Sequence, residues 1–141
     1  MTQLHENGRI IFAVLFLLGA IANAIILIIN PDMYRGFADI AILSFYYEAW
    51  TRYVNPNLPL LVGLIVAFEL FLFFSLISSG LFVRLGLLLA ASFMLFLVPF
   101  WWSGGGLLNL VFFLLLMWLS RFEYPVSAIQ VLRSRIVGEG I

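Results

Sequence analysis

Cysteine and lysine are both absent from this chain of 141 residues, and histidine occurs once, at His5. Without cysteine the chain has no thiol–disulfide chemistry and no thiolate ligand for a metal. The single histidine precedes the apolar segments, so we do not expect this chain to ligate haem by itself. The net charge is zero and no basic tract is present, which argues against nucleic acid as a partner.

Apolar residues dominate what is present. They make up 65% of the chain, charged residues make up only 10%, and the mean hydropathy is +1.15. A soluble domain of this length could not bury so much apolar surface, so we predict an integral membrane protein with one domain, residues 1–141. The predicted fold class is all-α, a four-helix transmembrane bundle. Its spans, each near the ~20 residues that a bilayer helix needs, are about 10–29, 59–79, 81–101 and 107–122.

The arginines predict an orientation for these four spans. More of them lie on the side that holds both termini and the second loop than on the opposite side: Arg9, Arg84, Arg121, Arg133 and Arg135 against Arg35 and Arg52. Positively charged residues are concentrated in cytoplasmic loops. We therefore predict a multi-pass protein of the cell membrane with both termini in the cytoplasm.

The segment between the first and second spans, residues 30–57, is too aromatic to float in water. We predict two short helical pieces, bent near Ser44, that form an interfacial or re-entrant segment at the outer end of the bundle. Trp101 and Trp102 are expected to be interfacial anchors. Residues 125–137 have apolar positions on one helical face and arginines elsewhere, which predicts an amphipathic helix on the cytoplasmic membrane surface.

Glu69 is the most informative polar residue, because it lies near the middle of the second span. At 1.5 Å of rise per residue it lies roughly 15 Å from Pro59, which is the depth of the bilayer midplane. An ionised carboxylate is costly at that depth unless it is paired or faces a polar cavity. Two interpretations stay open: Glu69 contacts a ligand or relays a proton, or it is hydrogen-bonded and holds the helices together.

The candidate ligand-binding residues are Glu69, Asn23, Ser92, Asn109, Tyr47 and Trp50. If the polar members within the spans point inward, they line a cavity for the head group of a quinone or a lipid. The two aromatic members could stack on a ring-shaped ligand, and an interfacial aromatic belt is the alternative.

Arg84 lies just inside the cytoplasmic end of the third span, and we interpret it as a structural charge that reaches the lipid head groups. Asp39 and Glu48 are a weak candidate for a metal site, because no histidine or cysteine lies nearby. The sequence therefore predicts no catalytic residue and no metal ligand.

Several short motifs occur together in this chain. They are Arg9 before the first span, Gly19 within it, Asn30-Pro31-Asp32-Met33-Tyr34-Arg35-Gly36-Phe37-Ala38 after it, and the pattern Gly63…Glu69…Gly80…Arg84 in the next two spans. Over about residues 9–120 the chain thus resembles the DoxX family of small four-span membrane proteins. The resemblance implies a link to sulfur-compound:quinone oxidoreduction, terminal oxidase assemblies or redox-stress membrane complexes. It would make Glu69 and Arg84 the family's characteristic charged pair. The chain departs from disulfide-active proteins of similar shape, because it lacks cysteine.

These observations lead us to expect a DoxX-like accessory subunit of a larger, respiratory membrane complex. Its partners would be membrane lipids and other membrane-protein subunits, and it would shelter a quinone or lipid near Glu69 without any covalently bound cofactor. One alternative is the membrane subunit of a quinone-reducing oxidoreductase, with Glu69 as proton relay. Another is a small transporter, against which the almost entirely apolar fourth span argues.

Overall fold

The computed structural model describes residues 2–100 and 105–138, and this part of the chain is all-helical, as predicted. The long helices are α1 (Thr2–Ile29), α4 (Leu58–Ile77), α5 (Leu81–Leu97) and α6 (Leu107–Leu119). The shorter ones are α2 (Asp32–Arg35), α3 (Ser44–Ala49) and α7 (Ala128–Val137). Single 3₁₀ turns lie at Ala38–Ile40, Asn55–Asn57 and Val98–Phe100, and a π-helical turn lies at Trp50–Val54.

Within the described residues, three helical segments are apolar and long enough to cross a membrane: Gln3–Ile29, Ser44–Ile77 and Leu81–Phe100. They cover the first predicted span and most of the second and third, and they support a membrane protein. α6 has 13 residues, which is about 20 Å at 1.5 Å per residue and less than the ~30 Å of a bilayer core. α1 begins at Thr2, before the predicted start of the first span at Ile10, and no proline between these two residues prevents a helix there.

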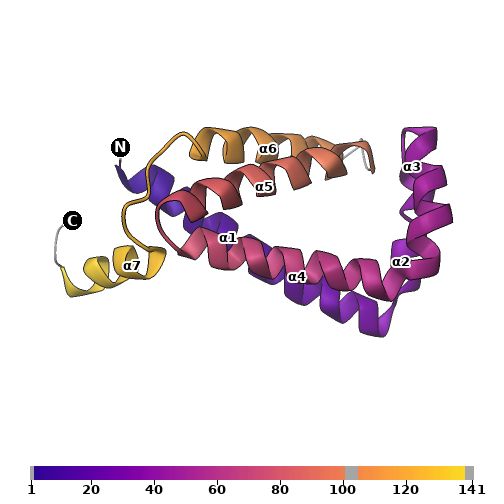
Figure 1. Cartoon of the computed structure of the whole chain (residues 1–141), viewed down its shortest axis with the longest axis horizontal. Coiled ribbons are helices and arrows are strands. Elements are labelled where there is room, and N and C mark those ends of the chain that lie inside the picture. The colour runs from indigo at the N-terminus through magenta and orange to yellow at the C-terminus, as the bar shows by residue number, and fades with distance from the viewer. Residues whose placement is uncertain (1, 101–104, 139–141) are drawn as a thin grey trace.

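The long helices form two antiparallel pairs (Figure 1). α1 packs along α4, α5 packs along α6, and α4 also contacts α5. The pairs meet at the end of the molecule that holds the start of α1, the α4–α5 turn and α7, which we call the closed end. They diverge toward the opposite end, the open end, across which α3 stands. The molecule is therefore open between α4 and α5 on the side of α3.

The closed end carries the main apolar core. α4 and α5 approach each other closely there, since a Cβ atom added at Gly86 would lie 2.7 Å from Cβ of Ser75. Gly80, at a φ of 63°, makes the tight turn between these helices, a conformation that glycine adopts without strain. The buried side chains of this core come from all four long helices and include Phe12, Phe16, Leu72, Leu76, Leu87 and Leu116.

Residues 30–57 cover the open end. The backbone is extended at Ala41 and Leu43, and this bends the segment directly before Ser44, where the sequence predicted a bend. Two small apolar clusters hold the segment to the long helices, one around Tyr34, Leu58 and Val62 and the other around Ala38, Trp50 and Phe100. Trp101 and Trp102, the expected interfacial anchors, lie outside the described residues.

The tail helix α7 begins with a capping box. Ser127 Oγ accepts a hydrogen bond from the backbone N–H of Gln130, and Gln130 Oε1 accepts one from the backbone N–H of Ser127. Ala128 and Val131 are buried against the rest of the molecule. The apolar face that the sequence predicted is exposed at Ile129, Leu132 and Ile136.

Candidate functional site

Glu69 is buried in the contact between α4 and α1, with 6% of its surface exposed. Asn23 of α1 donates a hydrogen bond from Nδ2 to Glu69 Oε2 at 2.8 Å. Gly19, one helical turn earlier on α1, leaves the room for the carboxylate, since a Cβ atom there would lie 2.8 Å from Glu69 Oε1. A small residue and an amide on α1 therefore accommodate the acid of α4.

The hydrogen bonds continue from Asn23 toward the open end. Tyr34 of α2 donates its hydroxyl proton to Asn23 Oδ1 at 2.7 Å, and Trp50 donates from Nε1 to the backbone oxygen of Tyr34, also at 2.7 Å. Burial raises the pKa of the Tyr34 phenol, and the nearby Glu69 carboxylate raises it further, so Tyr34 stays a donor. The chain Glu69–Asn23–Tyr34–Trp50 ties α4, α1 and the outer segment together.

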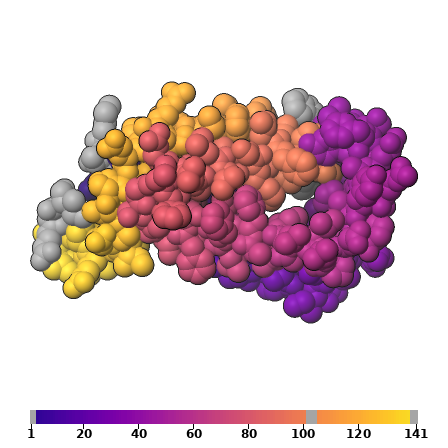
Figure 2. All heavy atoms as spheres, viewed as in Figure 1, coloured from indigo at the N-terminus to yellow at the C-terminus, as the bar shows by residue number. Residues whose placement is uncertain are grey.

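A cavity of about 370 Å³ lies between α4 and α5 near the open end. Figure 2 shows this hollow between the spheres of the two helices, closed on one side by the outer segment. At its rim Phe45, Leu64 and Phe96 are each more than half exposed. The lining residues include Phe45, Tyr46, Ala49, Trp50, Leu61, Leu64, Ile65, Phe68, Phe96 and Phe100.

The polar atoms of the cavity wall are engaged inside the protein. Tyr46 donates its hydroxyl proton to the backbone oxygen of Phe96 at 3.2 Å, and Trp50 Nε1 is bonded to Tyr34. Phe68 faces the cavity, whereas its neighbour Glu69 binds Asn23 on the α1 side of the same helix. The wall therefore offers hydrocarbon and aromatic rings, and it suits an apolar chain better than a polar head group.

The structure brings together three of the six predicted ligand-binding residues, Glu69, Asn23 and Trp50, in the hydrogen-bonded chain. It does not bring in the other three. Ser92 is exposed and donates to the backbone oxygen of Leu88 on its own helix. Tyr47 is 47% exposed, and neither it nor the half-buried Asn109 lines the cavity.

Arg84 lies toward the closed end, exposed, and donates from Nε to the backbone oxygen of Ser120 at 3.3 Å. Glu69 is bonded to Asn23 instead. Within residues 2–100 and 105–138, the pair that the family resemblance implies is therefore not an ion pair.

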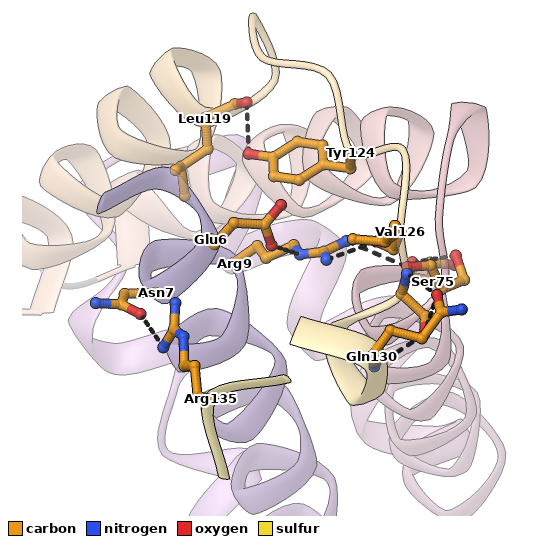
Figure 3. A network of polar contacts seen from close by, with 11 residues as sticks. Glu6, Asn7, Arg9, Ser75, Leu119, Tyr124, Val126, Gln130 and Arg135 are labelled. Carbon is orange, nitrogen blue, oxygen red and sulfur yellow. Dashed lines mark hydrogen bonds and ion pairs between the residues drawn. The ribbon is translucent and has the colours of Figure 1, made fainter. Parts of the chain in front are cut away.

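A buried arginine, Arg9, was not predicted from the sequence. Arg9 has no exposed surface, and its Nε lies 2.7 Å from Glu6 Oε2. It donates from one terminal nitrogen to the backbone oxygen of Ser78 at 3.1 Å and from the other to that of Val126 at 2.8 Å. The guanidinium also lies over the ring of Tyr124, 4.8 Å from its centroid (Figure 3).

One signal in the sequence could have revealed this group. Glu6 and Arg9 are separated by three positions, the spacing of an ion pair on one helical face. The predicted orientation counted Arg9 as a surface charge before the first span. In the structure α1 begins at Thr2, so Arg9 lies within the helix.

Comparison with known proteins identifies no relative. No family model, no curated protein and no solved structure matches this chain. The resemblance to the DoxX family therefore stays a prediction, carried by the short motifs alone.

Proposed function

We propose that this protein binds the apolar chain of a membrane lipophile in the cavity between α4 and α5. The observation that carries the proposal is the cavity itself: about 370 Å³, lined by carbon and reaching the surface beside exposed Leu64 and Phe96. Its volume falls in the range of roughly 300–1,000 Å³ that is typical of small-molecule sites.

The aromatic wall favours one kind of chain. Lipid tails are as apolar as the lining, so entry from the bilayer gains little from the hydrophobic effect, and selection depends on packing. Aromatic rings at the wall, among them Trp50, Phe68 and Phe100, pack well against flat, unsaturated groups. On this argument the isoprenoid tail of a quinone is a better occupant than a saturated acyl chain.

The proposal includes an arrangement in the cell membrane. The four long helices form a transmembrane bundle, residues 30–57 lie at its outer interface, and both termini are cytoplasmic. Without the buried Arg9, the exposed arginines still support this orientation: Arg84, Arg121, Arg133 and Arg135 on one side against Arg35 and Arg52 on the other. The exposed apolar face of α7, with Ile129, Leu132 and Ile136, supports contact of that helix with the membrane surface.

Within this proposal the protein is an accessory subunit of a larger, respiratory membrane complex. It takes part in that complex by binding the tail of the quinone. Glu69 then acts as a tie between α4 and α1, because its hydrogen-bond partner is Asn23. The DoxX resemblance supports the assignment to a redox complex.

The experiment fills the cavity. Ala49 lines it on α3, whereas Ala67 is exposed on α4 and does not line it, so Ala49→Phe and Ala67→Phe form a matched pair. Each variant and the wild type are purified in mild detergent, and the bound small molecules and protein partners are identified by mass spectrometry. We expect wild type and Ala67→Phe to retain a long-chain quinone, and Ala49→Phe to lose it.

Two results would refute the proposal in separate ways. Equal quinone retention by both variants would mean that the cavity does not hold the chain. A wild-type protein that purifies alone and carries only bulk lipid would remove both the ligand and the accessory role.

A further inference from the structure

A second cavity, of about 260 Å³, lies at the closed end. It is formed where the α4–α5 turn meets the chain that leads from α6 to α7, which Figure 1 shows at the same end of the molecule. Its lining residues are Gly80, Leu81, Arg84, Glu123, Tyr124 and Pro125. It shares no lining residue with the cavity at the open end.

The cavity is lined by two opposite charges that do not form an ion pair with each other. Arg84 and Glu123 are both exposed and both line it. Within residues 2–100 and 105–138 the ion pairs are Arg9–Glu6 and Arg35–Asp32, so neither lining charge is in one. The Nε of Arg84 donates to the backbone oxygen of Ser120, which directs the guanidinium while its terminal amino groups can still donate.

The positive side of the cavity is reinforced by the start of α5. The first N–H groups of a helix have no partner within it, and the helix dipole favours an anion there. The N–H of Gly80 is already donated to the backbone oxygen of Tyr124 at 2.7 Å, but the amides of the first turn, beginning at Leu81, follow it. Arg84 lies on the next turn, so an anion beside both is favoured.

Tyr124 gives the cavity a fixed wall. Its hydroxyl donates to the backbone oxygen of Leu119 at 2.9 Å, its own backbone oxygen accepts from Gly80, and 1% of its surface is exposed. Arg84 and Glu123 therefore line the cavity beside a fixed residue, and a ligand that meets both must present an anion and a cation.

The surface beside the cavity is apolar. Leu81, Phe82 and Leu85 on α5 are 66%, 67% and 46% exposed. A ligand whose charged group enters the cavity can therefore lay hydrocarbon along this face of α5.

We infer that the closed-end cavity binds the head group of a phospholipid that carries both a phosphate and a primary ammonium group. The phosphate lies at Arg84 and the α5 amides, the ammonium lies at Glu123, and the acyl chains follow α5. An anionic lipid without an amine meets the Glu123 carboxylate unfavourably, and a quaternary ammonium cannot donate a hydrogen bond to it.

The test measures lipid choice by the full-length protein. Delipidated protein in detergent is offered equal amounts of dioleoyl phosphatidylethanolamine and dioleoyl phosphatidylglycerol, which share their acyl chains, and the bound lipids are counted by native mass spectrometry. We expect wild type to prefer the ethanolamine lipid by about twofold to fivefold, the scale of an exposed charge pair. Glu123→Gln should abolish the preference, and Arg84→Gln should weaken binding of both lipids.

Matched controls separate the cavity from general surface charge. Arg133 on α7 and Glu48 on α3 are exposed and lie outside the cavity, so Arg133→Gln and Glu48→Gln should behave as wild type. The inference would be overturned if Glu48→Gln abolished the preference as Glu123→Gln does, or if Arg133→Gln weakened binding of both lipids as much as Arg84→Gln. Glu123 is exposed, so the Glu123→Gln variant should fold. This variant still tests the inference if Arg84→Gln fails to fold.

A further arm distinguishes a lipid from a soluble phosphate ester. Soluble O-phosphoethanolamine has the same charged groups without acyl chains, and we expect it not to displace the lipid at matched concentration. Displacement would overturn the assignment to a lipid, and an unchanged preference in Glu123→Gln would overturn the head-group site as a whole.

Discussion

Replacing Arg9 by methionine should destabilise the fold more than any other single change that removes an arginine. Methionine keeps most of the length and the apolar stem of the side chain and removes the guanidinium. Arg9 is fully buried, and its loss leaves the carboxylate of Glu6 and the carbonyls of Ser78 and Val126 without their partner. These groups come from α1, the α4–α5 turn and the chain before α7, so three parts of the closed end lose their connection.

The size of the effect follows from the contacts. Removing one partner of a buried ion pair costs about 3–5 kcal/mol, mainly because the other charge stays buried. Each hydrogen bond from a charged group to a carbonyl adds about 1.5–3 kcal/mol in favourable cases. Glu6 keeps 8% of its surface exposed and can recover some hydration. We therefore expect Arg9→Met to lower the free energy of unfolding by about 3–5 kcal/mol, the range for breaking the ion pair.

The assay is reversible unfolding in mixed micelles, followed by tryptophan fluorescence. Arg133→Met is the control, because Arg133 is exposed on α7 and should change stability by less than about 0.5 kcal/mol. The double variant Glu6→Gln/Arg9→Met should regain part of the loss, since it no longer buries an unpaired carboxylate. If Arg9→Met differed from Arg133→Met by less than about 1 kcal/mol, or the double variant regained nothing, the ion pair would not have the role that we assign to it.

Two further predictions concern other buried contacts. Gly19→Ala should destabilise by about 1–3 kcal/mol in the same assay, because its Cβ would lie 2.8 Å from Glu69 Oε1. Gly63→Ala, where nothing lies within 4 Å, should stabilise by up to about 1 kcal/mol, and equal effects at the two glycines would contradict the packing of α1 on α4. Tyr124→Phe should cost about 1 kcal/mol at neutral pH, through its lost hydrogen bond. Burial raises the pKa of Tyr124 above its usual value of 10.0, so above that pH the unfolded chain loses a proton that the folded one keeps. The contribution of this group is therefore complete below pH 10 and falls as the pH rises beyond it, and unfolding measured from pH 9 to 11 should show a steeper loss for wild type than for Tyr124→Phe.

The membrane-spanning helices were predictable because composition decides them: an apolar run of sufficient length has few alternatives to a helix in a bilayer. Glu69 was conspicuous in the sequence because it lies within such an apolar run, and in the structure Asn23 and Trp50 belong to its hydrogen-bonded chain. The direction in which Ser92 points was not predictable. Helices that are apolar on every side give no periodicity from which a buried face can be derived. A serine hydroxyl can also donate its hydrogen bond to a backbone oxygen of its own helix, as Ser92 does.

The cavity at the open end and the burial of Arg9 depend on tertiary structure. The cavity lies where the helix pairs diverge, whereas α4 and α5 are in close contact at Ser75 and Gly86 near the closed end. Arg9 becomes buried only through carbonyls that lie 69 and 117 positions away in the sequence. No local pattern specifies such distant partners.

Those separations have a consequence for biosynthesis. Arg9 leaves the ribosome before both of its distant partners, and it meets Ser78 only after α4 has been made, and Val126 only after α6. Until then its charge stays hydrated beside a helix that is otherwise ready to insert. The N-terminal end of α1 can settle only when the chain that follows α6 has been made, so a nascent protein truncated before Val126 exposes an arginine with a terminal nitrogen that lacks its carbonyl acceptor.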